Sequence, residues 1–330
     1  MAGLKSPLEI LASASRRDFK NLLRARQRTS QGIEERLEKI ATFEHDPDAS
    51  VVLMGSWGRA EVTAGSDDDF MLLVDGPDRS TVTPSIEHIA GVLDTPPGSR
   101  GPFGQPVFCD RLVEDIGLDR DSNNNLTRRM LFLLESVPLT ATHVFIDARD
   151  RVLSRYLDES VKDYRPPRFL LNDVVRYWRT VCVDFAGKEY DGPEKWGLRN
   201  AKLRTSRKIL FAGGLLPVLG CSRLDRDEMP MFLRDQFDMP PTDRIAAAFL
   251  QHSAIDAGAR ALGAYDEFLG LLDDQTFRDE LHELARDAAG ESEAFAVAGR
   301  LGHELQAGLL ALLFETESSL PELVREYAIF

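Results

Sequence analysis

A glycine–serine turn between two short apolar runs, followed by three aspartates, constrains the fold of this chain more than any other feature. The first run is Val51–Met54, and Gly55–Ser56 follows it directly. Asp67–Asp69 then leads into the second run, Phe70–Val74. Short apolar runs of this kind predict buried β-strands, and a Gly-Ser pair favours a turn that opens a helix. The segment therefore predicts two strands of one sheet joined through a short turn of helix.

The alternation of side chains along a strand brings Asp67 and Asp69 together. Residues i and i+2 project from the same face, so Asp68 between them points away and is not expected to be a ligand. Two adjacent carboxylates repel each other, and Mg²⁺ prefers oxygen ligands of this kind, usually alongside substrate phosphates. The backbone N–H groups and hydroxyl at Gly55 and Ser56, at the start of a helix, can hold a phosphate. Together these residues predict phosphoryl or nucleotidyl transfer.

The pattern G-S-x-G-R-x-E-x-T-x-x-S-D-x-D over residues 55–69 resembles the signature of the DNA polymerase β superfamily of nucleotidyltransferases. Its form is most similar to the nucleotidyltransferase domain of protein-PII uridylyltransferases. The resemblance implies a core that binds an NTP with Mg²⁺ or Mn²⁺ and transfers NMP to an acceptor hydroxyl, with release of pyrophosphate. The alternative is an acidic, solvated turn between two strands, since such aspartate clusters are common in loops.

The resemblance also implies a third carboxylate, on a later strand beside the Asp-x-Asp strand. The segment 105–112 (QPVFCDRL) predicts a third strand, and Asp110 is the carboxylate on it. Asp110 is therefore expected to join Asp67 and Asp69 as a catalytic metal ligand. The alternative is an ion pair between Asp110 and Arg111 or Arg59 at the end of a strand.

Phosphate contacts are expected from both halves of the chain. Arg59 either contacts phosphate or pairs with Glu61 or Asp69. In relatives with a helical second domain, cations from one of its helices bind the triphosphate, and the segment 198–212 is dense in cations. On a helix, Arg199, Lys202 and Ser206 fall within about 60° of one another, so they are expected to line one wall of a cleft between domains.

The periodicity of the whole chain predicts an α+β core followed by an all-helical domain. Residues 7–43 are expected to be helical and to extend a catalytic core over 1–160, with 1–45 as its N-terminal extension. Strands and helices alternate in this core, which favours a small mixed sheet. Tyr164-Arg165-Pro166-Pro167 marks a boundary because paired prolines cannot continue a helix. Helices recur over 161–330, which we expect to be the second domain.

Composition restricts the location and partners of the protein. The net charge of −14 disfavours unspecific nucleic-acid binding, because no global positive field attracts phosphate. No apolar run is long enough to span a membrane, no signal peptide is evident, and the three cysteines show no metal-ligand spacing, so a cytoplasmic location is expected.

Residues 1–30 carry seven Lys/Arg and two acidic residues, whereas 261–330 carry fifteen acidic residues and four Arg. The basic N-terminal helix could bind RNA, or it could dock on acidic helices of the same chain or of a partner.

Four classes of acceptor are compatible with this resemblance. A protein side chain follows from the uridylyltransferase resemblance, although this chain is too short for the added domains of those enzymes. The nucleotidyltransferase toxins of toxin–antitoxin systems suggest tRNA as acceptor and an antitoxin protein as partner. Cyclic-oligonucleotide synthases of antiphage defence suggest a second nucleotide, and an antibiotic hydroxyl is a fourth candidate. The non-enzymatic alternative is a regulatory protein that binds nucleotide without turnover.

Overall fold

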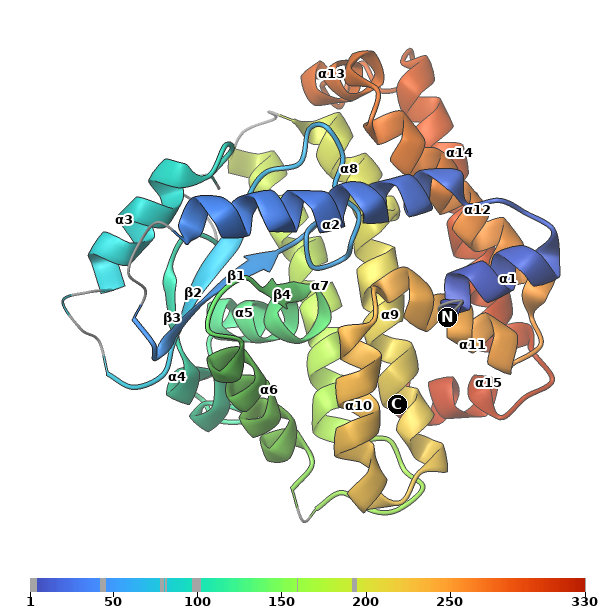
Figure 1. Cartoon of the computed structure of the whole chain (residues 1–330). Coiled ribbons are helices and arrows are strands. Elements are labelled where there is room, and N and C mark those ends of the chain that lie inside the picture. The colour runs from blue at the N-terminus through green and yellow to red at the C-terminus, as the bar shows by residue number, and fades with distance from the viewer. Residues whose placement is uncertain are drawn as a thin grey trace.

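The computed structural model describes residues 5–41, 46–77, 80, 82–96, 102–158, 160–191 and 195–329, apart from the side chains of 189–191. A small mixed sheet lies at one side of the molecule, and helices surround it and form the remainder (Figure 1). The strands are β1 (Ala49–Met54), β2 (Phe70–Val74), β3 (Pro106–Phe108) and β4 (Ser136–Pro138). The expected positions 42–43 of the N-terminal helix lie outside the described residues.

The strands follow the order β3-β2-β1-β4 across the sheet. β1 pairs antiparallel with β2 and with β4, while β3 runs parallel to β2. The two strands expected from the apolar runs are therefore confirmed. The strand expected over 105–112 forms only at Pro106–Phe108, because the chain turns into a helix at Cys109. The short strand β4 has only three partly buried residues, and its apolar pattern is too brief to predict.

Helices make up most of the remaining chain. In the first half they are α1 (Pro7–Ser15), α2 (Lys20–Ile40), α3 (Val82–Val92), α4 (Cys109–Glu114), α5 (Asn123–Leu134) and α6 (Thr142–Tyr156). The second half contains α7 (Arg168–Asp191), α8 (Trp196–Arg204), α9 (Ser206–Gly220), α10 (Met229–Asp238), α11 (Pro241–Gln251), α12 (Ile255–Leu272), α13 (Gln275–Glu283), α14 (Glu293–Leu310) and α15 (Leu320–Leu323). Short 3₁₀ segments are η1 (Cys221–Arg223) and η2 (Arg226–Glu228), and π segments are η3 (Ala311–Glu315) and η4 (Val324–Ile329). The predicted helical second half is present, and Pro166–Pro167 immediately precedes α7.

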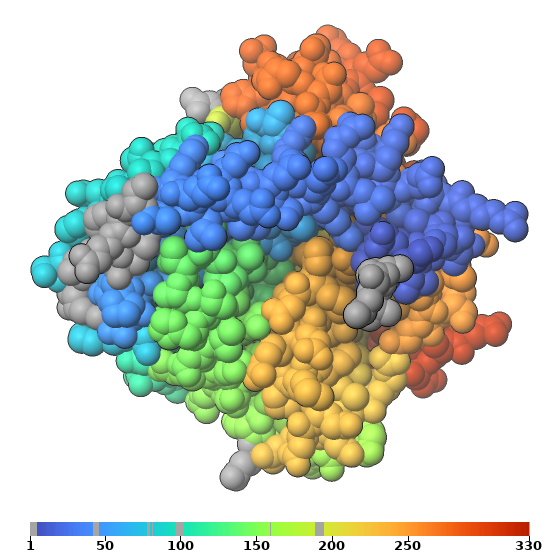
Figure 2. All heavy atoms as spheres, viewed as in Figure 1, coloured from blue at the N-terminus to red at the C-terminus, as the bar shows by residue number. Residues whose placement is uncertain are grey.

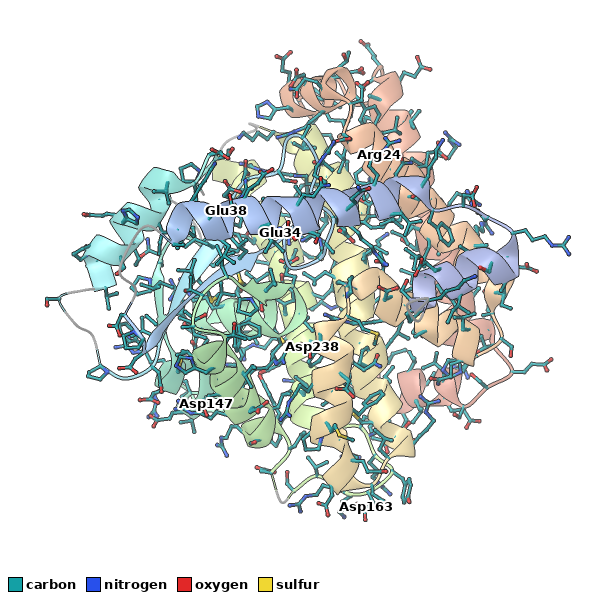
Figure 3. All side chains as sticks on the ribbon, viewed as in Figure 1. Arg24, Glu34, Glu38, Asp147, Asp163 and Asp238 are labelled. Carbon is teal, nitrogen blue, oxygen red and sulfur yellow. The ribbon has the colours of Figure 1, made fainter. Side chains whose placement is uncertain are left out.

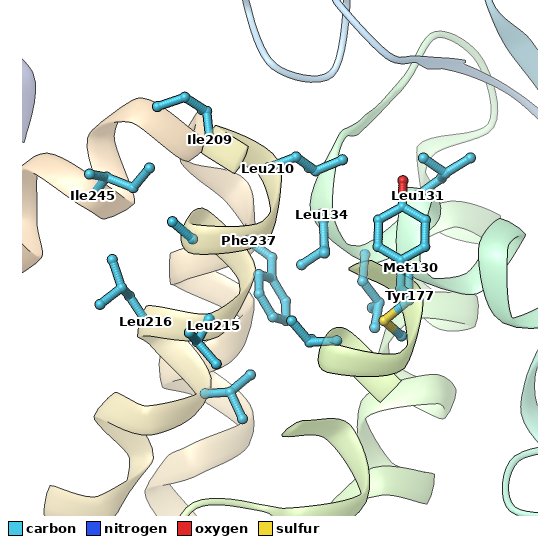
Figure 4. Packing of buried hydrophobic residues seen from close by; sticks show 14 of the residues in the cluster. Met130, Leu131, Leu134, Tyr177, Ile209, Leu210, Leu215, Leu216, Phe237 and Ile245 are labelled. Atoms are coloured by element: carbon cyan, nitrogen blue, oxygen red, sulfur yellow. The ribbon is translucent and has the colours of Figure 1, made fainter. Parts of the chain in front are cut away.

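Apolar side chains bury both faces of the sheet. One face, which includes Val52 and Met71, belongs to a hydrophobic core that continues through the helices of the second half. Figure 4 shows part of this core, where residues of α5 and α7 pack with those of α9, α10 and α11. The opposite face, which includes Val51 and Leu72, packs with Ile40 and Ile89 in a smaller cluster. The boundary expected at 160/161 thus falls within one continuous core.

The N-terminal helices join the sheet to the C-terminal helices. α2 runs across the front of the molecule from the sheet to α12, and its side chains form a band across the upper part of that face (Figures 1 and 2). Asn21 and Leu22 donate their backbone N–H groups to Asp266 at 2.8 Å, and Arg26 pairs with Asp243 at 2.9 Å. The basic N-terminal segment therefore packs against helices of its own chain, where Arg26 and Arg28 pair with carboxylates.

The outer face of α2 carries charges of both signs. Figure 3 shows Arg24 toward the C-terminal helices and Glu34 and Glu38 toward the sheet end of the helix. This mixture differs from the continuous cationic stripe that binds a nucleic-acid backbone. None of the described helices is long and apolar enough to cross a membrane.

Candidate active site

Gly55 directly follows the last residue of β1, and the chain turns there beside Asp69. Its φ of 64° lies in the left-handed region, and a β-carbon at this position would lie 3.0 Å from Asp69 Oδ2. The following residues form successive turns, in which Arg59 N–H donates to Gly55 O at 3.0 Å and Glu61 N–H to Ser56 O at 2.8 Å. The helix expected over 56–62 does not form; the segment 55–60 is a series of tight turns. Ser56 therefore adjoins the carboxylates from a turn and not from a helix N-terminus.

The three aspartates alternate as expected. Asp68 is fully buried and accepts hydrogen bonds from Arg36 Nε at 2.7 Å and from the Thr95 N–H at 3.1 Å. Met54 N–H donates to Asp69 O at 2.8 Å, which continues the strand pairing one residue before β2. Asp67 and Asp69 consequently share the opposite side of the strand from Asp68.

The Asp69 carboxyl has an unusual affinity for its proton. Burial, and then the charge of Asp67, raise its pKa from 3.8 to about 6. Arg207 and Arg59 lower this pKa and Glu135 raises it, so all five charges belong to one cluster. A carboxylate pair held in mutual repulsion has the donor set that a divalent cation stabilises.

Asp110 lies far from this pair. It stands in the first turn of α4, and its carboxylate is exposed and paired with Arg151. Because β3 is parallel to β2 with Phe108 opposite Val74, Asp110 follows the end of β2 whereas Asp69 precedes its start. The five residues of β2 separate these ends by roughly 16 Å. The prediction that Asp110 completes the metal centre is therefore wrong, and the described residues contain no group of three His, Cys, Asp or Glu side chains arranged to hold a metal.

Arg59 is built into the protein interior. Its Nε lies 2.8 Å from Glu61 Oε2, and its Nη1 pairs with Glu135. Of the two expected roles, the structure has the internal ion pair with Glu61, and Glu135 takes the place of Asp69 as the second partner. Gly58 makes this arrangement feasible, because any β-carbon there would collide with the Glu135 backbone at 2.0 Å.

Helix α12 reaches this cluster through Tyr265. The buried Tyr265 hydroxyl lies 2.7 Å from Glu61 Oε2 and 3.1 Å from Ser206 Oγ. Ser206 is itself 6% exposed, so the prediction that its hydroxyl faces a triphosphate is wrong. Burial raises the pKa of Glu61, whose Oε1 has no hydrogen-bond partner among the described residues. Tyr265, which also contacts Ser206, thus fixes the position of the Gly55–Glu61 turn through its hydrogen bond to Glu61.

The segment 198–212 is two helices. α8 ends at Arg204 and α9 begins at Ser206, and between them Thr205 has φ −125° and ψ −89°. This break rotates Lys202 and Ser206 onto different sides, which explains why one lines a cavity and the other is buried.

A cavity of about 590 Å³ lies between α8 and the segments α5 and α7. Arg199, Lys202 and Arg207 line one wall, and the other walls carry aromatic, apolar and amide side chains, including Phe103, Asn123, Asn124, Leu131, Tyr177, Val181 and Phe185. Arg207 Nη1 lies 3.3 Å from Glu135 Oε1. Trp178 of α7 does not line this cavity and stacks on Phe211.

Lys202 connects the cavity to the aspartate pair. Its side chain is exposed to the cavity, but surrounding protein limits the solvation of its ammonium group. This burial, together with the charges of Arg207, Arg278 and Arg59, lowers its pKa to about 8, while Asp67 opposes the shift. The cations of the helical half and the aspartates of the core are therefore electrostatic neighbours.

Comparisons with protein-family models and with curated proteins found no match to this chain. Its function must therefore be argued from the site. The sequence had indicated Gly55, Ser56, Asp67, Asp69 and the cationic segment, which the structure brings together. It had not indicated Glu135 or Tyr265 as parts of the site, because neither stands in a recognisable pattern. The sequence predicts Arg199, Lys202 and Ser206 as the cleft wall and does not single out Arg207.

Proposed function

We propose that this protein is a metal-dependent nucleotidyltransferase that transfers NMP from an NTP to an acceptor hydroxyl. The observation that carries the proposal is the convergence of Asp67 and Asp69 with Lys202, Arg207 and a large cavity. Paired carboxylates beside several cations are suited to a ligand that combines a divalent metal with several phosphates.

The fit of Mg²⁺ or Mn²⁺ follows from the electrostatics of the pair. Asp67 raises the pKa of Asp69, so an added cation relieves a repulsion that the fold maintains. A bound metal supplies charge neutralisation at the phosphate undergoing substitution. Two carboxylates leave further coordination positions for phosphate oxygens and water, in keeping with the way Mg²⁺ is usually bound.

Each neighbouring group has a role that needs no covalent intermediate. The turn at Gly55–Ser56 presents a hydroxyl to a phosphate beside Asp69, and Lys202 and Arg199 contribute positive charge from the cavity wall. Glu135 orients Arg207, and Glu61 orients Arg59. Catalysis of this type depends on positioning and charge stabilisation.

The cavity favours a nucleoside over a bare polyphosphate. Tyr177 and Phe103 contribute aromatic side chains to the lining of the cavity, and Asn123 and Asn124 contribute amide donors and acceptors. A base needs apolar faces and directional polar groups, and the phosphates need cations, so one ligand can satisfy both walls.

Label transfer is the direct test of this function. The protein is incubated with each α-labelled NTP alone, with total RNA, and with cell lysate, so that a nucleotide, RNA or protein acceptor becomes labelled in a different arm. An antibiotic acceptor is tested by adding aminoglycosides as a fourth arm. We expect transfer in one arm, and loss of at least about 10²-fold in an Asp67→Asn/Asp69→Asn variant.

Calorimetry with each NTP and Mg²⁺ separates an enzyme from a regulatory binder. Saturable NTP binding without label transfer in any arm would favour the non-catalytic alternative. Wild-type turnover by the doubly substituted variant would exclude the proposed site. Lys202→Ala is expected to weaken NTP binding roughly 10-fold or more without loss of apo-protein stability.

A further inference from the structure

The loop that leads into the aspartate pair is fastened to the helical half of the chain. Ser66 N–H donates to Thr63 O at 3.1 Å, which closes a tight turn. Ala64 N–H donates to Asp273 Oδ1, at the end of α12, at 2.8 Å. Asp273 in turn pairs with Arg28 of α2. The loop is therefore positioned by two other elements before it reaches Asp67.

Arg278 of α13 occupies the space that Gly65 leaves open in this loop. A β-carbon on Gly65 would lie 0.5 Å from Arg278 Nη1 and 1.7 Å from its Cζ. The backbone of Gly65 is not left-handed, so a side chain at position 65 would disturb only this contact with the end of the Arg278 side chain. Gly65 precedes Asp67 by two residues, which limits the separation of their Cα atoms to about 7 Å. The Arg278 guanidinium therefore lies against the loop two residues before Asp67.

Arg278 has no carboxylate partner among the described residues. Its side chain is partly buried, and within the described residues it makes no ion pair or side-chain hydrogen bond. α13 packs against α8, where Gly197 N–H donates to Leu284 O at 3.2 Å, and the charge of Arg278 acts on Lys202. Partly buried cations that repel each other gain most from an anion placed between them.

We propose that Arg278, in contact with Gly65, provides a further cation that binds the polyphosphate of the nucleotide. A guanidinium offers a planar fork of donors that matches phosphate oxygens. The phosphate site then includes Arg278 beside the Gly65 loop, in addition to the cations of α8 that line the cavity. This inference rests on the proposed function, since it assigns a further contact to the same phosphate ligand.

Calorimetry with Mg²⁺ and inorganic tripolyphosphate tests the inference without requiring a known base or acceptor. Arg278→Ala is expected to weaken binding roughly 10–100-fold. Gly65→Ala should weaken binding in the same direction, because its methyl group displaces the end of the Arg278 side chain and removes no charge. Arg300→Ala is the matched control, because Arg300 is an exposed residue of α14 that pairs with Glu267. We expect this variant to bind as the wild type does.

A double variant shows whether Gly65 acts through Arg278. If it does, Gly65→Ala/Arg278→Ala binds no more weakly than Arg278→Ala alone. A larger loss would overturn that linkage. Equal binding by wild type and Arg278→Ala, with weakened binding by Lys202→Ala, would overturn the inference and leave the proposed function standing. If the wild-type protein binds no tripolyphosphate, the phosphate site does not exist, and both proposals are wrong.

Discussion

Gly55 and Asp69 are in such close contact that no other residue fits at position 55 without displacing the carboxylate. A β-carbon there would lie 3.0 Å from Asp69 Oδ2, and φ at Gly55 is 64°. The left-handed backbone and the contact with Asp69 each favour glycine at position 55. A side chain there would strain the turn and would also displace the carboxylate.

Gly55→Ala is expected to reduce both stability and NMP transfer. The left-handed conformation costs a residue with a β-carbon about 1–2 kcal/mol, and the contact moves Asp69. Thermal unfolding and label transfer measure the two effects. Gly91→Ala is the matched control, because Gly91 lies in α3 and a β-carbon there meets nothing within 4 Å. That control should leave activity unchanged and increase stability by up to about 1 kcal/mol. Equal behaviour of the two variants would contradict the proposed role of Gly55.

Tyr265→Phe tests the support of the turn from α12. Removing the hydroxyl takes a hydrogen bond from the buried Glu61 carboxylate, which costs about 1–3 kcal/mol. Burial already raises the pKa of Glu61 in the folded protein. Ionisation of this carboxyl therefore destabilises the fold. Such a group stabilises the fold below its ordinary pKa of 4.5, and this contribution is lost as pH rises through the higher folded value.

The loss in Tyr265→Phe should therefore be larger at neutral pH than near pH 4.5. Denaturant unfolding at the two pH values measures the difference. Tyr164→Phe provides the comparison, since Tyr164 is 60% exposed. A pH-independent loss in Tyr265→Phe would show that the hydroxyl contributes only packing.

The aspartates of the pair and Asp68 between them should respond oppositely to amide substitution. Asp69 has a folded pKa of about 6, above its ordinary 3.8, so its stabilising contribution is present below pH 3.8 and lost as pH rises through about 6. Asp67→Asn/Asp69→Asn should therefore raise the apo-protein melting temperature at neutral pH by roughly 2–4 °C, while it removes the stabilisation by Mg²⁺.

Asp68→Asn breaks a buried ion pair with Arg36 and should cost about 3–5 kcal/mol. Thermal unfolding with and without Mg²⁺ compares the variants. A lower melting temperature in the double variant, or retained Mg²⁺ stabilisation, would argue against a metal site at Asp67 and Asp69.

Local patterns predicted those parts of the site that depend on neighbouring residues. The alternation at Asp67–Asp69 follows from strand geometry alone, and the buried Asp68 confirms it. The apolar runs predicted β1 and β2, because each strand is buried along its whole length.

The errors arose where distant segments determine the outcome. Asp110 was placed on a strand that ends at Phe108, and the parallel pairing of β3 sets it at the wrong end of β2. Ser206 was assigned to one continuous helix, but the break at Thr205 turns it toward Tyr265. Arg278 meets Gly65 across 213 positions of the chain, a contact that no local pattern encodes.

The pH dependence of nucleotide binding should have two limits, set by one group from each half of the chain. Metal binding requires the ionised Asp69 carboxylate, so affinity for Mg²⁺ with an NTP should rise with pH and level off above about 6. Phosphate binding requires the Lys202 ammonium, so affinity should fall as pH rises above about 8. Dissociation constants measured by calorimetry across this range should therefore be lowest between the two values. Lys202→Arg keeps the positive charge at this position, because a guanidinium does not lose its proton in this range. In this variant the affinity for the nucleotide should no longer fall above about pH 8. An alkaline fall that persists in Lys202→Arg would show that another group titrates, and that Lys202 is not the cation on which binding depends.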